Sequence, residues 1–329
     1  MKKKIAINGF GRIGRLALRN LMKNKNVEVV GINDLTDTIT LAHLFEFDSN
    51  HRRYDGTVSV EGNNIVVDGQ EIRTTSIKDP AQLPWGELGV DVVLECTGIF
   101  RTTEKAMLHI EAGAKKVILS APAKSTGIPT VVIGVNQDII KKDDLIVSNA
   151  SCTTNCLASL VKVIEDNYGI QTGFMSTIHA YTSNQNIQDA PHSDLRRARA
   201  AAENLIPTST GAAEALALVI PSIKGKIFAS CIRVPVPTGS IVELTVQTDK
   251  TVTVEGVNKA FAAAAKGQLK GVLEYSDKPL VSSDIVSNPH TCIFDSLLTE
   301  VHQGQLKVTA WYDNEAGYAA KLAEMVDLV

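Results

Sequence analysis

Two cysteines and a histidine are the residues whose types and spacing suggest covalent chemistry. Cys152 and Cys156 lie four apart in VSNASCTTNCLAS (147–159), and His179 follows in FMSTIHAY. A thiolate is a good nucleophile, and a histidine nearby in space can act as its base. The cysteines could also form a metal clip, a disulfide or a redox pair, and His179 could be purely structural. The surrounding chain has to decide among these.

Composition narrows the choice. Five cysteines, an odd number in a chain of 329 residues, do not resemble a secreted disulfide framework. No further Cys/His cluster with zinc-ligand spacing lies near Cys152, so we expect no metal. The net charge of −3 gives no basic footprint for nucleic acid, and no apolar run has the length of a membrane span. We therefore expect a cytoplasmic enzyme-sized protein without nucleic acid or membrane as its primary partner.

The elements that would position the thiol begin with apolar runs in the first half of the chain. They cover residues 4–7, 27–33, 90–96, 115–122, 130–136 and 145–150. Helical patterns follow the first and third runs, ending near Leu21 and Ala112. Near-continuous Val/Ile runs separated by helices predict a parallel sheet covered on both faces. Residues 58–72 read instead as a hairpin.

The pattern changes after residue 150. A helical pattern spans 151–166, and alternating runs then cover residues 173–181, 226–236, 239–247 and 305–313. Alternation predicts a mainly antiparallel sheet with one covered face. Helical patterns at 253–267 and at the C-terminal end complete this half. The expected fold class is α/β: a Rossmann-type, mostly parallel, doubly wound sheet plus an α+β catalytic domain with a mainly antiparallel sheet.

A glycine fingerprint indicates a dinucleotide cofactor. Gly9, Gly11 and Gly14 in INGFGRIGR follow a predicted strand and open a predicted helix, where free N–H groups favour a diphosphate. Asp34 ends the next strand about 20 residues later, where a carboxylate binds the ribose and disfavours NADP. Asp34 could instead be a helix cap or turn residue. Thr97 and Ser120 end later strands and are further candidates for cofactor contact, with a turn-forming role as the alternative.

The second half offers donors for phosphate groups. Arg197 lies in DLRRARAA, Arg233 in RVPVPTGS, and the run from Thr208 to Gly211 precedes a further predicted helix. Guanidinium and hydroxyl groups that converge would bind a phosphate. Surface salt bridges are the alternative for both arginines.

For Cys152, the first turn of a helix predicts an accessible thiol with a depressed pKa.

Six motifs occur in order along the chain: INGFGRIGR, SNASCTTNCLA, HAYT, DLRRARAAAENLIPTSTGAA, RVPVPTGS and WYDNE. With these motifs the sequence resembles the phosphorylating glyceraldehyde-3-phosphate dehydrogenase family over essentially its whole length. The resemblance implies an NAD-binding domain of residues 1–150 and 314–329, and a catalytic and phosphate-binding domain of residues 151–313. It also implies a homotetramer that binds glyceraldehyde 3-phosphate and inorganic phosphate.

The resemblance assigns roles to individual residues. Cys152 would be the nucleophile and His179 its base. Hydride would pass to NAD, and phosphate would release the resulting acyl thioester. The implied cofactor contacts add Arg12, Ile13, Lys78 and Asn314 to Gly9, Gly11, Gly14, Asp34, Thr97 and Ser120. The substrate phosphate would bind Thr182 and Arg233, the attacking phosphate Ser151, Thr153, Thr210 and Gly211, and Arg197 would serve this cluster.

The sequence departs from the family pattern at three positions. Ala316 stands where tryptophan is common, Arg52 where glycine is usual, and Ser159 where proline is common. We expect slightly looser packing at Ala316 and intact chemistry. Alternative functions are an erythrose-4-phosphate dehydrogenase, a nucleotide-fold binding protein without catalysis, and a thiol hydrolase that uses no cofactor.

Overall fold

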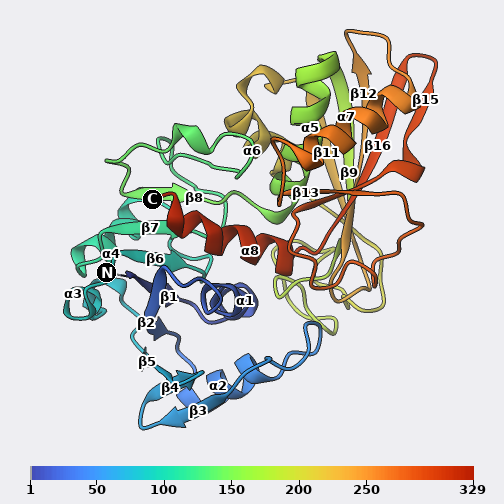
Figure 1. Cartoon of the computed structure of the whole chain (residues 1–329). Coiled ribbons are helices and arrows are strands. Elements are labelled where there is room, and N and C mark those ends of the chain that lie inside the picture. Colours follow the sequence, from blue (N-terminus) through green and yellow to red (C-terminus); the bar gives the residue numbers. More distant parts are fainter. Residues whose placement is uncertain (1) are drawn as a thin grey trace. The chain divides into compact units, whose positions relative to one another are not determined.

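The computed structural model describes residues 2–329, which form two compact units. Unit 1 comprises the described residues up to Val131, then Gln137–Ala150 and Ala319–Val329. Unit 2 comprises Val132–Asn136 and Ser151–Tyr318. Each unit is built around one large sheet (Figure 1).

The sheet of unit 1 has the order β3-β4-β5-β2-β1-β6-β7-β8. The strands from β5 to β8 in this order are parallel to their neighbours, whereas β3, β4 and β5 form an antiparallel meander that confirms the predicted hairpin. The strands are β1 Lys3–Asn8, β2 Val27–Asn33, β3 Val58–Glu61, β4 Asn64–Val67, β5 Gln70–Thr75, β6 Val92–Glu95, β7 Lys116–Leu119 and β8 Ile146–Ser148.

Helices cover this parallel sheet. They are α1 Arg12–Leu21, α2 Thr38–Glu46, α3 Trp85–Leu88 and α4 Thr103–Glu111, and α8 Ala316–Glu324 enters the unit at Ala319. Three consecutive residues of β1, Ile5, Ala6 and Ile7, are fully buried, as expected for a strand covered on both faces. Each such Ile stabilises the fold by about 1.5–3 kcal/mol relative to leaving it exposed.

The sheet of unit 2 has the order β10-β11-β9-β12-β16-β14-β13, with β15 paired to β16. Its pairings are antiparallel except β9 with β11 and β13 with β14, so the predicted fold class is confirmed. The strands are β9 Ile170–Ala180, β10 Ile206–Thr208, β11 Ile227–Val234, β12 Ser240–Thr248, β13 Leu273–Ser276, β14 Cys292–Asp295, β15 Glu300–His302 and β16 Gln305–Tyr312.

One long helix, α5 Cys152–Tyr168, packs against β9, β12, β14 and β16. It also contacts α6 Ala212–Val219 and α7 Val254–Lys266. Ser151 caps its N-terminus, since the Ser151 hydroxyl accepts a hydrogen bond from the Thr154 N–H. The cap fixes where α5 begins and therefore places Cys152 in its first turn.

The strand predicted for residues 130–136 is absent from the described structure. Thr130 forms only an isolated bridge to Ser148. The chain then turns, because Gly134 has φ +85° and the Asn136 side chain accepts a hydrogen bond from the Val132 N–H. A Cβ on Gly134 would lie 2.9 Å from Leu269. Val131 and Val132 are fully buried although they lie outside any named strand, so the apolar character here accompanies burial in a loop.

The C-terminal segment of unit 1 is tied to β1. The Lys3 ammonium donates to the carbonyl oxygens of Val326 and Val329, at 2.6 and 2.7 Å. Asn24, beyond α1, donates to Asp327 at 3.0 Å. Throughout residues 2–329, none of the helices combines the length and apolar character that crossing a bilayer requires.

Candidate functional site

A pocket of about 770 Å³ lies in unit 1 at the carboxyl ends of the parallel strands. Five of the predicted cofactor contacts line it: Gly9, Gly11, Asp34, Lys78 and Thr97. They come from the loops that follow β1, β2, β5 and β6, the edge where ligands bind in open parallel sheets.

The glycines shape one wall of the pocket. Gly9 has φ +92°, and a Cβ there would lie 2.7 Å from the Thr97 nitrogen. A Cβ on Gly14 would lie 2.2 Å from the Gly9 oxygen, so only glycine lets α1 approach the turn. Gly11 begins α1 and has open space around it. The bare turn and the helix N-terminus therefore fit a diphosphate group.

Asp34 combines a place in the pocket wall with hydrogen bonds to the local backbone. Its carboxylate lines the pocket and also accepts hydrogen bonds from the N–H groups of Phe10 and Thr36, at 2.8 and 3.1 Å. These contacts tie the end of β2 to the glycine turn and hold the carboxylate at the pocket wall.

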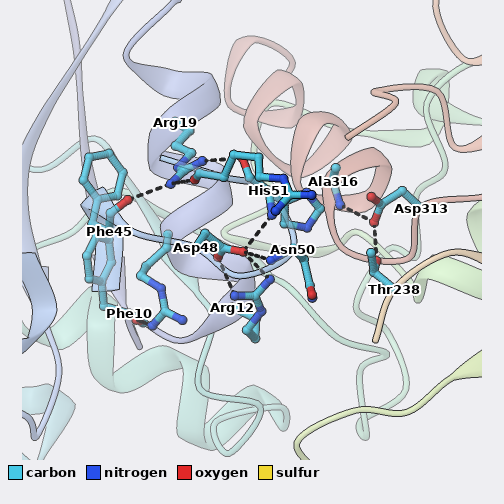
Figure 2. Close-up of polar contacts among 12 residues, drawn as sticks. Phe10, Arg12, Arg19, Phe45, Asp48, Asn50, His51, Thr238, Asp313 and Ala316 are labelled. Atoms are coloured by element: carbon cyan, nitrogen blue, oxygen red, sulfur yellow. Dashed lines mark hydrogen bonds and ion pairs between the residues drawn. The ribbon is translucent and has the colours of Figure 1, made fainter. Parts of the chain in front are cut away.

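Other predicted cofactor residues do not line this pocket. Arg12 forms a two-pronged ion pair with Asp48 (Figure 2). Burial opposes the ionisation of Asp48, but Arg12 and the N–H groups of His51 and Asn50 lower its pKa to about 2. Ile13 and Gly14 lie in the first turn of α1. Ser120 is hydrogen-bonded to Cys96, which does line the pocket. Asn314 belongs to unit 2, where its carbonyl oxygen accepts from Gly239 and Ser240.

Several pocket residues escaped the sequence interpretation. They are Asn8, Asn33, Leu35, Ile77, Asp79, Pro80, Cys96, Ile99, Phe100 and Leu108. Most follow directly on the same strand ends as the predicted residues. Seven of them lie within two positions of Asp34, Lys78 or Thr97, and Asn8 precedes Gly9, whereas Phe100 and Leu108 lie three and eleven positions beyond Thr97 and carry no such signal.

In unit 2, the structure brings the predicted thiol and imidazole together. Cys152 Sγ lies 3.4 Å from His179 Nε2, although 27 residues separate them in sequence. Cys152 comes from the first turn of α5 and His179 from the end of β9. The His179 ring is buried and packs edge-on against Tyr312. A proton can pass directly between these two side chains.

The electrostatics differ from the expected depressed thiol pKa. Burial raises the pKa of the Cys152 thiol, although Arg233 and Thr153 oppose this effect. Burial, and after it the charge of Arg233, lowers the pKa of His179 to about 3. The prediction of a lowered thiol pKa is therefore wrong for this structure, because loss of solvent outweighs the favourable charges. Thiol and imidazole are both neutral near pH 7.

Arg233 connects the imidazole to a cationic region. Arg233 and His179 are partners across the parallel pair β11–β9, and Arg233 Nη1 lies 2.5 Å from His179 Nδ1. Nδ1 also lies 2.6 Å from the Ala180 oxygen. Arg233 and Arg197 both lower the pKa of Cys231, which burial raises. The two guanidinium groups therefore act on the same region of β11.

The other predicted phosphate residues lie along these elements. Arg197 donates to the Thr208 hydroxyl at 2.6 Å, and Thr208 is on β10, the neighbour of β11. Thr210 and Gly211 stand at the N-terminus of α6, where the Thr210 hydroxyl accepts from the Ala212 N–H.

Thr182, Ser151 and Thr153 complete the predicted set. Thr182 follows β9, and its N–H donates to Gln185. Ser151 caps α5, whereas the buried Thr153 hydroxyl lies 3.0 Å from the Tyr312 hydroxyl. Thr153 is thus the predicted phosphate residue least able to present its side chain, although its N–H remains in the first turn of α5.

The comparisons with known proteins agree on one family. Residues 3–103 match the family model for the glyceraldehyde 3-phosphate dehydrogenase NAD binding domain, and residues 151–314 match the model for the C-terminal domain. Glyceraldehyde-3-phosphate dehydrogenase of Mycobacterium avium is 55% identical over 336 aligned positions, covering 100% of this chain and 99% of the relative. The enzymes of Geobacillus stearothermophilus and Priestia megaterium are 54% and 53% identical, covering 97% and 98% of their own lengths.

The chain belongs to the glyceraldehyde 3-phosphate dehydrogenase family. The resemblance seen in the sequence is therefore confirmed, and NAD is the cofactor of this NAD-binding domain. The comparisons favour neither an erythrose-4-phosphate dehydrogenase nor a binding protein without catalysis.

The departures from the family pattern now have structural settings. Arg52 has φ +65°, a left-handed conformation that explains why glycine is usual there. Ala316 begins α8, and its N–H donates to Asp313, which also accepts from Thr238 (Figure 2). The Ser159 hydroxyl donates to the Asn155 carbonyl within α5.

Proposed function

We propose that this protein oxidises glyceraldehyde 3-phosphate in the cytoplasm, in glycolysis and gluconeogenesis, and forms 1,3-bisphosphoglycerate with NAD and inorganic phosphate. The observation that carries the proposal is the 3.4 Å contact between Cys152 Sγ and His179 Nε2 in an NAD-binding chain of this family. The proposed division of labour is that residues 1–150 and 314–329 bind NAD, while residues 151–313 hold the reacting groups.

The neutral thiol and imidazole define the first step. As the Cys152 sulfur attacks the aldehyde carbon, His179 Nε2 accepts the thiol proton, because a raised thiol pKa leaves little thiolate beforehand. The resulting thiohemiacetal oxygen lies near the N-terminus of α5, whose dipole favours negative charge. NAD, when bound, accepts the hydride. Cys152 then carries an acyl thioester, and phosphate attack releases it as thiolate.

Through Arg233, the binding of the substrate phosphate would also influence which ring nitrogen of His179 carries the proton. The Ala180 carbonyl requires a proton on His179 Nδ1, which leaves Nε2 with the lone pair that a base needs. Arg233 is a donor and competes for the same Nδ1. A phosphate that draws Arg233 away would favour the tautomer of His179 with its proton on Nδ1, in which Nε2 is free to accept the thiol proton. Thr182 and Arg233 are the proposed substrate-phosphate contacts. Ser151, Thr153, Thr210 and Gly211 are those for inorganic phosphate, and Arg197 serves the same cluster.

The proposed cofactor contacts are Gly9, Gly11, Gly14, Asp34, Lys78 and Thr97, together with Arg12, Ile13, Ser120 and Asn314. Asp34 would favour NAD over NADP, since its carboxylate repels a 2′-phosphate.

The test is an assay of cofactor reduction with glyceraldehyde 3-phosphate, NAD and phosphate. We expect turnover that requires phosphate or arsenate and that is slower with erythrose 4-phosphate or with NADP. Equal steady-state turnover without phosphate, or no reduction at all, would refute the proposed reaction.

We further propose a homotetramer. Phe174 of β9 and Phe228 of β11 stack at 5.6 Å with 68% and 60% of their surface exposed. Ile232 continues the same face of β11 and is also exposed. An exposed apolar row of this kind on a sheet favours contact with another copy of the chain.

A further inference from the structure

A buried polar network lies directly behind the cofactor pocket of unit 1. Its centre is Glu95, at the carboxyl end of β6, which is 1% exposed. His109 of α4 is fully buried beside it. Two of the partners of Glu95, Asn8 and Thr97, line the pocket. Burying a carboxylate costs free energy that hydrogen-bond donors must offset, so the donors around Glu95 indicate its role.

Four donors surround the carboxylate. Oε2 accepts from Asn8 Nδ2 at 2.6 Å and lies 3.0 Å from His109 Nε2. Oε1 accepts from the Thr97 N–H at 2.8 Å and from the Thr97 hydroxyl. The indole N–H of Trp85 can only donate, and it donates to His109 Nδ1 at 3.1 Å. The proton of His109 is therefore on Nε2, where it points at Glu95.

The orientation of Asn8 is fixed from the other side of the network. The Ile77 N–H donates to Asn33 Oδ1 at 2.9 Å, so Asn33 Nδ2 faces Asn8 Oδ1 and donates to it at 2.8 Å. Asn8 must then present its own NH₂ group to Glu95. Because a backbone donor begins this sequence, neither amide can turn over without placing two donors against each other.

The side chain at position 95 must consequently offer a hydrogen-bond acceptor at both of its terminal atoms. An ionised carboxylate accepts from all four donors. A glutamine would place its NH₂ group either against Asn8 and His109 or against Thr97, and an unpaired buried donor costs about 1–3 kcal/mol. Glutamine has the same side-chain length as glutamate, but its amide therefore leaves a buried donor of this network unpaired.

The network reaches the pocket through two loops. Thr97 packs against Gly9, where an added Cβ would meet the Thr97 nitrogen at 2.7 Å. Asn8 precedes Gly9, and Ile77 precedes Lys78 in the pocket wall. The charge also acts at the pocket: burial chiefly raises the pKa of Cys96 to about 12, and Glu95 adds to the rise against the opposing Ser120.

We propose that Glu95 is a positioning residue for NAD, whose carboxylate sets the glycine turn at Gly9 and the loop at Ile77 in the geometry that receives the cofactor. The proposal rests on NAD binding by unit 1, and not on the chemistry of Cys152.

The first experiment measures the Kd for NAD by titration calorimetry on the full chain. Glu95→Gln should raise Kd at least about tenfold, or about 1.4 kcal/mol. Asp91→Asn is the matched control, because Asp91 adjoins the opposite end of β6 and pairs with Lys115. It should stay within about twofold of wild type. A Glu95→Gln protein that melts cooperatively and binds NAD with the wild-type Kd would overturn the proposal.

A second pair of variants keeps the test open if Glu95→Gln does not fold. His109→Leu removes the donor to Glu95, whereas His109→Gln can donate to Glu95 and accept from Trp85. We expect His109→Leu to raise KM for NAD several-fold with little change in kcat, and His109→Gln to restore most of the loss. Equal KM values in both variants and wild type, or a loss confined to kcat, would contradict the role.

Discussion

Cys152 and Cys156 differ in the surroundings that decide which thiol can react. Cys152 is partly accessible and contacts His179, whereas Cys156 is fully buried one turn deeper in α5. Burial and the neighbouring Cys292 raise the pKa of Cys156 well above its ordinary value. We expect Cys152→Ser to lower kcat by at least about 10³-fold and Cys156→Ser to keep kcat within about threefold. Equal losses in steady-state assays would remove the assignment of one nucleophile.

His179 should make the protein sensitive to acid. Its folded pKa is about 3, whereas the ordinary value is 6.5. Between these values the unfolded chain binds a proton that the folded chain excludes, so stability falls as pH falls through this window. At pH 4.5 the loss is at most about 2–3 kcal/mol. Urea unfolding at pH 7 and pH 4.5 should show a smaller difference for His179→Asn than for wild type. An unchanged difference would contradict this explanation.

The glycine fingerprint at the start of α1 contains two glycines, Gly11 and Gly14, with different requirements. A Cβ on Gly14 meets the Gly9 oxygen, but a Cβ on Gly11 meets nothing within 4 Å and its φ is −74°. Gly14→Ala should therefore lower both the free energy of unfolding, by about 1–3 kcal/mol, and the affinity for NAD. Gly11→Ala should weaken only NAD binding, because it fills the space for the diphosphate. Thermal melting and calorimetry separate the two effects, and a normal Kd in Gly11→Ala would exclude close approach there.

A turn, a helix start or a strand can be predicted from the sequence when the pattern that indicates it lies within one short segment. The Gly9–Gly14 turn, the start of α5 and the alternation in β9 are all local patterns. The run 130–136 shows the limit, because an apolar composition reports burial and does not distinguish a buried loop from a strand. The contact of Arg233 with His179 depends on the register of β9 and β11, which join residues 54 positions apart. The raised pKa of Cys152 depends on packing in the same way.

Self-association concerns the outer surface of the second sheet. If the row containing Phe174 and Phe228 lies in a subunit interface, Phe228→Asp should shift the protein toward smaller species in sedimentation velocity. Ile139→Asp is a suitable control, since Ile139 is an exposed apolar residue of unit 1. A tetramer that survives Phe228→Asp would place the interface elsewhere.

At the scale of the whole chain, the sequence predicts the fold class, but it predicts only some of the residues that line the pocket. The glycine fingerprint and its spacing predict Gly9 and Asp34, and the rule that ligands bind at strand ends predicts Thr97. Their neighbours Leu35, Ile77 and Phe100 form the same cavity because β5, β2, β1 and β6 are adjacent in the sheet. That order depends on crossovers between distant strands, which the periodicity of any one segment does not contain.

The division of the chain into segments has a consequence for biosynthesis. Unit 2 has all its residues once Tyr318 has left the ribosome, whereas unit 1 still lacks residues 319–329. These residues supply the carbonyl groups that Lys3 holds against β1. Domains fold as their residues emerge during synthesis. The thiol-bearing unit should therefore be able to fold first, and the last part of α8 with the C-terminal residues that Lys3 binds should join unit 1 after it.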